Sequence, residues 1–172
     1  MHLYVFFDTD CRQDLEKHGG FFEHVPNLMC SADCCECEEV EDANVDCEHR
    51  RKRVHWFWQH PVGTFIDYLR LSRPFADKVY AISQTSRGYD AQIILRRVLE
   101  HIWESNFILD GSKILSMVVE NLLFLYSLNY LPMILKSMPR SIELTYRKGH
   151  YRHFFNTASN LSHEGPYSEH EF

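Results

Sequence analysis

Hydrophobic positions along the chain fall into short apolar runs that are separated by polar turns and by two segments with helical spacing. The first run, residues 3–7, is apolar throughout and leads directly into the acidic segment at residues 8–10, as a buried strand with a polar end does. Pro61 suits the first turn of a helix, and apolar residues recur at helical spacing from Asp90 as far as Ile102. The pattern predicts strands at residues 3–7, 27–32, 54–58, 78–83, 107–109, 113–120 and 122–126, helices at 61–71 and 90–103, and a short helix from Pro132 to Pro139.

Strands and helices are intermixed without an internal repeat, and Asp110-Gly111 and Glu120-Asn121 suit the tight reversals of antiparallel hairpins. We therefore expect an α/β fold, with a mixed sheet flanked by helices. With 172 residues, the chain is long enough for one domain with its own core. It has no apolar run of the roughly 20 residues that span a membrane, and no secretory signal opens it. We expect an intracellular protein without a membrane partner. The sequence does not distinguish between the nucleus and the mitochondrion as its compartment.

The distribution of charge changes the meaning of the net charge of -6. Residues 21–49 contain nine Asp and Glu and no Lys or Arg, whereas residues 50–153 contain sixteen Lys and Arg against eight Asp and Glu. We interpret the first part as containing an acidic, Cys-bearing insertion at about residues 33–53 in an otherwise basic domain. Such a domain can still attract a polyanion.

All six cysteines lie within the first 47 residues. Without a secretory signal, metal binding or plain reduced thiols are better interpretations than a disulfide framework. Four residues of the insertion offer the ligand set of a structural Zn²⁺ site: Cys34, Cys37, Cys47 and His49. The alternative is a reduced, partly exposed loop.

Three carboxylates form the main candidate site. Asp8 and Asp10 follow the first predicted strand, and Asp90 begins a predicted helix. Oxygen ligands select hard cations, and two such ions about 4 Å apart can activate a water molecule and stabilise a leaving alkoxide. The ordinary alternative is a surface loop for the first two residues and a helix N-cap for Asp90.

Five segments follow one another along the chain: Asp8-Thr9-Asp10, His24-Val25-Pro26-Asn27-Leu28, Arg87-Gly88-Tyr89-Asp90, Tyr126-Ser127-Leu128 and Lys148-Gly149-His150. In this order they resemble the N-terminal exonuclease region of protein-primed family B DNA polymerases. The likeness is strongest to the organellar, viral and Maverick/Polinton transposon branch of that family, and it extends over nearly the whole chain.

The resemblance implies a ribonuclease-H-like fold in which carboxylates bind two divalent ions, Mg²⁺ or Mn²⁺, and the 3′-terminal phosphodiester of DNA is hydrolysed. It implies that Asp8 and Asp10 stand for the family's first motif, Asp-x-Glu, and that Asp90 ends the second. These three residues are then both the catalytic residues and the metal ligands. The residues expected to contact single-stranded DNA, or the terminal protein that primes synthesis, are Tyr89, Ser127, Leu128, Arg87 and Lys148.

The chain also departs from the family pattern. Asp10 replaces a Glu, which draws the carboxylate back by one C–C bond, about 1.5 Å. Gln84 or Thr85 stands near a usual Asn, and Tyr126 stands where Asp is common. We expect the last exonuclease carboxylate and the polymerase palm to lie beyond residue 172. The chain alone is then expected not to polymerise, and to be a weak or inactive nuclease.

A basic run at residues 50–53 precedes Trp56 and Trp58, and such a combination can neutralise phosphates and stack bases. The alternative is a solvated charge run beside core tryptophans. The preferred hypothesis is a fragment of a DNA-directed DNA polymerase that retains most of a proofreading exonuclease domain. A second hypothesis is a degenerate, transposon-derived remnant that binds single-stranded DNA without catalysis, and a third is a zinc-stabilised interaction module.

Overall fold

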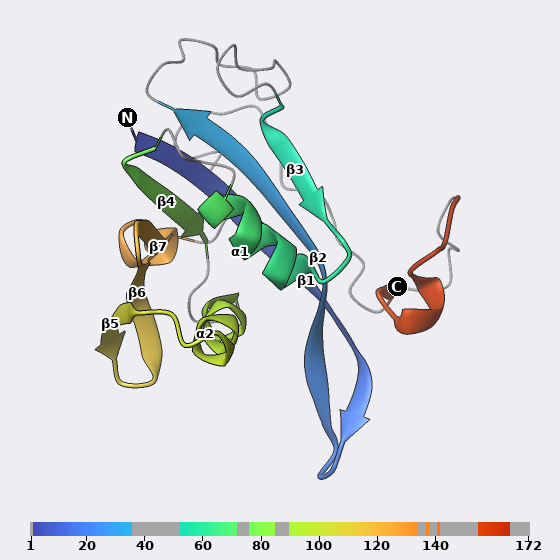
Figure 1. Ribbon diagram of the computed structural model, residues 1–172. Helices are drawn as coiled ribbons and strands as arrows, with labels where there is room; N and C mark the ends of the chain where they lie inside the picture. Colours follow the sequence, from blue (N-terminus) through green and yellow to red (C-terminus); the bar gives the residue numbers. More distant parts are fainter. Residues whose placement is uncertain are drawn as a thin grey trace.

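The computed structural model describes residues 2–35, 52–71, 76–84, 90–133, 137, 141 and 155–165 (Figure 1). The elements in these ranges are β1 (His2–Lys17), β2 (Phe21–Cys35), β3 (Val54–Phe57), α1 (Pro61–Leu71), β4 (Lys78–Ser83), α2 (Asp90–Glu100), β5 (Ser105–Asp110), β6 (Lys113–Val119), β7 (Leu122–Tyr126), and the 3₁₀ turns η1 (Ser127–Asn129) and η3 (Ala158–Asn160). None of the helices in the described residues is long and apolar enough to span a membrane.

The seven strands form one mixed sheet in the order β3-β2-β1-β4-β7-β6-β5. The neighbours β1, β4 and β7 run parallel, whereas β2 and β3 on one side and β6 and β5 on the other pair antiparallel. A parallel centre is thus bordered by two antiparallel parts. The predicted α/β class and its mixed sheet are confirmed.

Both described helices cover the same face of this sheet, since their buried side chains join one core with those of the strands. Side chains alternate along a strand, so every second residue of β1 points into that core. Leu3, Val5 and Phe7 of β1 point into one continuous core that also holds the buried sides of α1 and α2. Phe65 of α1 lies at the centre of this core, with its ring 5.0 Å from that of Phe7 and 5.6 Å from that of Phe57. The core therefore sits between the sheet and a single layer of helices.

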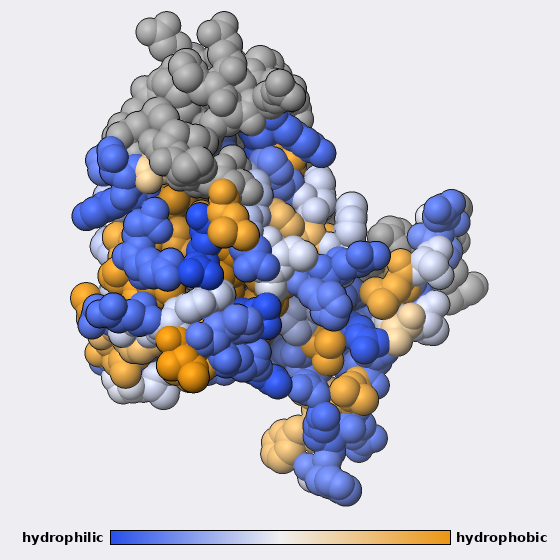
Figure 2. Space-filling view, viewed as in Figure 1, coloured by the Kyte–Doolittle hydropathy of each residue, from blue (hydrophilic) through white to orange (hydrophobic). Residues whose placement is uncertain are grey.

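The hairpin formed by β1 and β2 is longer than the sequence pattern predicts. Its outer half projects away from the sheet and carries a mainly hydrophilic surface (Figures 1 and 2). That part lacks the apolar alternation that identifies a strand buried on one face. Gly19 and Gly20 form its turn with φ of 95° and 76°, a conformation that glycine adopts without steric cost.

Most other predicted elements agree closely with the structure, and α1, β4 and β7 have the predicted bounds. The second helix ends at Glu100 rather than at the predicted residue 103, so Ile102 is not part of it. Ile102 has a φ of 53° and is 92% exposed, and the next amide, of Trp103, donates to the carbonyl of Val98. This reversal terminates the helix in the manner of a left-handed cap.

The predicted insertion and the short helix lie largely outside the described residues. Residues 33–35 belong to β2, so any insertion begins after them, and residues 36–51 are not described. The amide of Asp33 donates to the carbonyl of Arg53 at 2.9 Å, which brings the two ends of this segment together. Pro132 and Met133 are not helical, and most of residues 134–140 are not described.

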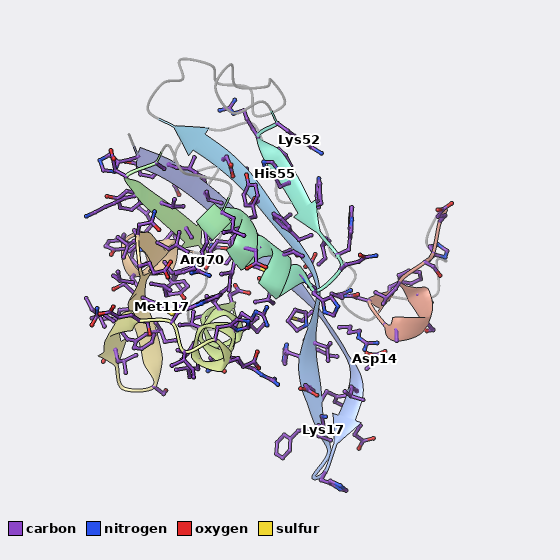
Figure 3. All side chains as sticks on the ribbon, in the orientation of Figure 1. Asp14, Lys17, Lys52, His55, Arg70 and Met117 are labelled. Atoms are coloured by element: carbon purple, nitrogen blue, oxygen red, sulfur yellow. The ribbon has the colours of Figure 1, made fainter. Side chains whose placement is uncertain are left out.

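A bidentate ion pair fixes α1 to the turn between β6 and β7. Arg70, labelled in Figure 3, donates from Nε and Nη2 to the two carboxylate oxygens of Glu120 at 3.1 and 2.9 Å. The same guanidinium lies over the ring of Trp103, 4.2 Å from its centre. Planar, two-point contacts of this kind are more specific than a single surface charge pair.

Phe65→Ala should remove about 3–5 kcal/mol from the free energy of unfolding, because it leaves a cavity among Phe7, Phe57 and the sheet. Leu71→Ala, at the end of the same helix, should change stability by less than about 0.5 kcal/mol, since Leu71 is 74% exposed. Urea denaturation followed by circular dichroism measures both values. Equal losses in the two variants would contradict this description of the core.

Candidate functional site

Two of the three predicted carboxylates, Asp8 and Asp10, lie on β1 just beyond the residues that pair with β4, and the third, Asp90, begins α2. Asp8 is exposed and Asp10 half-buried, and both share the face of β1 that lies opposite the helices. Thr9 and Cys11 alternate with them and are buried on the helical side. Asp90 is the first residue of α2 and is only 4% exposed.

Two thiols close to the predicted carboxylates, those of Cys11 and Cys30, have raised pKa values. Burial raises the pKa of Cys11 to about 12, and the charges of Asp90 and then Asp10 contribute to the same shift. The pKa of Cys30 is also raised, first by burial and then by Asp8 and Asp10. Asp10 therefore acts on both thiols, whereas Asp90 acts on the helical side and Asp8 on the other.

Buried polar side chains lie just beyond the part of β1 that pairs with β4, and at the ends of β4 and β7. Thr9 belongs to β1, and Ser83 of β4 pairs in register with Tyr126 of β7. With Cys11 and Asp90 these residues make up what we call the strand-end cluster, and all five are buried. The carboxyl ends of parallel strands are where α/β sheets ordinarily bind their ligands.

The strand-end cluster contains three buried hydroxyl groups. Those of Thr9, Ser83 and Tyr126 are buried and make no hydrogen bond to another of the described residues. Burial, and then the charge of Asp90, raise the pKa of Tyr126, so its phenol is neutral at physiological pH. A buried hydroxyl is stabilised when it gains a hydrogen-bond partner.

The predicted Ser-Leu element lies directly beside the strand-end cluster. Ser127 and Leu128 open η1, immediately after β7, and both are half-buried. The amide of Leu128 donates to the carbonyl of Gln84 at 3.1 Å, and the amide of Leu131 donates to the carbonyl of Ser127 at 2.7 Å. The turn is thereby held against the end of β4.

Several predicted site residues lie outside the described residues: Arg87, Tyr89, Lys148, Cys37, Cys47 and His49. Cys34 is described, half-buried near the end of β2. The Zn²⁺ site and the DNA contacts of Arg87, Tyr89 and Lys148 therefore stay predictions.

Within the described part of the chain, no three His, Cys, Asp or Glu side chains converge as a metal ion requires. The strand geometry gives the reason, because Asp8 and Asp10 share one face of β1 while Asp90 lies on the other side. As described, these residues do not fit a shared divalent ion. The Mg²⁺ or Mn²⁺ site stays a prediction.

The predicted basic and aromatic segment before α1 contains both exposed and buried side chains. Lys52 is exposed, but Arg53 is buried, and its Nε donates to the carbonyl of Asp33 at 3.4 Å. The tryptophans are not core residues: Trp56 is 49% and Trp58 66% exposed. Their rings lie parallel, 6° apart, with centres separated by 6.3 Å.

No protein-family model, curated protein sequence or solved structure matches the chain. The residues and their placement therefore carry the functional argument. Sequence reasoning missed Thr9, Cys11 and Ser83 as members of the site. The alternation of the first strand was a usable signal for Thr9 and Cys11, since they occupy the positions beside the two aspartates.

Because the thiol of Cys11 is buried, the free energy of unfolding should decrease as the pH rises into the alkaline range. Between its ordinary pKa of 9.0 and its raised value of about 12, the folded protein keeps a proton that the unfolded chain has lost. The stabilisation is complete below pH 9 and declines above it, by at most about 1.4 kcal/mol per pH unit. Urea denaturation at pH 8.5 and 10.5 should show a larger decline for the wild type than for Cys11→Ala. Equal declines would contradict the shift.

Proposed function

We propose that the chain is the exonuclease-like domain of a protein-primed family B DNA polymerase, that it binds single-stranded DNA, and that its own 3′–5′ exonuclease activity is weak or absent. One observation carries this proposal. Asp90 opens α2 just after β4, and β4 pairs in parallel with β1, the strand that bears Asp8 and Asp10. The first and second motifs of the resemblance are thus neighbours at one end of the sheet.

The topology supports the ribonuclease-H-like part of the proposal. An antiparallel meander, β1-β2-β3, is followed by α1, which crosses over to β4 beside and parallel to β1. A second crossover leads through α2 to β7, parallel to β4, and the β5-β6 hairpin extends the edge. This order is what we expect of a ribonuclease-H-like sheet with an additional hairpin.

The carboxylates support weak rather than efficient hydrolysis. Asp10 has a shorter side chain than the family's Glu, and its face of β1 lies opposite the side on which Asp90 is buried. A small divalent ion tolerates little distortion of its ligand shell. In the parent family the ions would activate the attacking water, so poorly placed ligands reduce the rate of that reaction.

The exposed tryptophans and the absence of three converging metal ligands in the described residues also favour a second candidate function. This candidate is a transposon-derived remnant that binds single-stranded DNA and leaves it uncut. Such binding depends on phosphate neutralisation and base stacking and needs no divalent ion.

Degradation of a 5′-labelled single strand in Mg²⁺ or Mn²⁺ tests the proposal. The wild type should trim the 3′ end little faster than Asp8→Ala does. Asp10→Glu should increase trimming at least about tenfold, because the longer side chain extends the carboxylate by about 1.5 Å. This gain should disappear when Asp8→Ala or Asp90→Asn is added, which also excludes a contaminating nuclease.

The outcomes separate the candidates. If the Asp10→Glu protein binds the strand but still leaves it intact, the remnant without catalysis is favoured. Robust trimming by the wild type that Asp8→Ala abolishes would contradict the weak-nuclease part of the proposal and leave the family assignment standing.

A further inference from the structure

A groove of about 500 Å³ opens where β1, β2, the β3–α1 connection and α2 meet. Its volume is typical of pockets that hold small ligands or single residues of a polymer. Its polar lining comes from Arg12, Asn27, His60 and Arg97, with Trp58 beside them, and none of the described residues that line it is an Asp or a Glu. The groove is thus a positively charged recess with an aromatic wall.

The two arginines come from distant parts of the chain, and each keeps donors for a ligand. Arg12 is 3.6 Å from Asp14, whose carboxylate also accepts a hydrogen bond from the amide of Ala158. Arg97 is 3.9 Å from Glu100. A guanidinium has five N–H donors, so one long ion pair leaves most of them available.

The first turn of α1 is shaped around one of these side chains. A Cβ at Gly63 would lie 3.1 Å from Nη2 of Arg97, closer than ordinary contact. Glycine at this position lets the guanidinium lie against the helix, at the wall of the groove.

The aromatic wall is suited to a flat ligand. Trp58 is 66% exposed, and Trp56, parallel to it, supports it. Exposed indole faces stack on unpaired bases, and arginines beside them neutralise the connecting phosphates. A duplex hides its base faces, and an acidic peptide has none to offer.

We infer that this groove binds a segment of single-stranded DNA, with one base on Trp58 and its flanking phosphates on Arg12 and Arg97. The inference deepens the proposed function, on which it rests for the choice of DNA. Arg12 follows Asp10 by two residues, so the groove and two of the predicted carboxylates share the strand β1.

Fluorescence anisotropy with a 5′-fluorescein-labelled dT12 strand, measured in EDTA, tests the inference without any nuclease reaction. Trp58→Leu should weaken binding about tenfold, while Trp58→Phe should retain most of it. Log affinity falls linearly with log salt concentration, and Arg12→Gln and Arg97→Gln should each make this negative slope shallower by about 0.7. Lys113→Gln is the matched control, because it removes the same charge on β6, far from the groove in the strand order, and should change neither quantity.

Thermal melts of each variant establish that the protein is folded, so a loss of binding reports on the groove. Failure of the wild type to bind, or equal binding by the wild type and the Trp58 and arginine variants, would overturn the inference. The inference would also be overturned if inorganic polyphosphate displaced the labelled strand as well as unlabelled DNA does and Trp58→Leu left DNA binding unchanged. Binding with the expected variant pattern but without trimming by Asp10→Glu would leave the groove standing and count against the proposed nuclease.

Discussion

The parallel pairing of β1 with β4, and of β4 with β7, is the constraint on which the rest of the structure depends. Parallel neighbours need crossover connections, and α1 and α2 supply them on one face of the sheet. Because the parallel-paired parts of all three strands then end at the same end of the sheet, polar residues from distant parts of the chain are brought there. The strand-end cluster is a consequence of this pairing.

The alternation of side chains along β1 decides on which face of the sheet each residue lies. A one-residue step moves a side chain to the opposite face, so Thr9 and Cys11 enter the helical side while Asp8 and Asp10 leave it. Burial without full compensation is costly for polar groups, and the raised pKa of Cys11 reflects that environment. The spacing of two aspartates predicts that they share a face, but it does not identify the face.

Local sequence signals predicted much of the fold and less of the site. Pro61 and the apolar spacing after it define α1, and the β-branched run of β4 is unambiguous because both are buried against one core. The outer hairpin escaped prediction because its residues are mostly exposed and contribute none of the described core, so its folding requires no apolar alternation. The pairing of Ser83 with Tyr126 joins positions 43 residues apart, and no local periodicity encodes such a contact.

Irregular pairing explains how Arg12 can face the groove although it follows Asp8 and Asp10 on the same strand. The register of β1 against β2 shifts between Asp10 and Cys11 and again between Arg12 and Leu15. Bulges increase the local twist of a strand, and they redirect the side chains next to them. Arg12, between the two shifts, can therefore reach the recess that Arg97 lines from the helical layer. The irregular register thus accompanies a change of direction in which Arg12 lines the groove, two residues beyond Asp10 on the same strand.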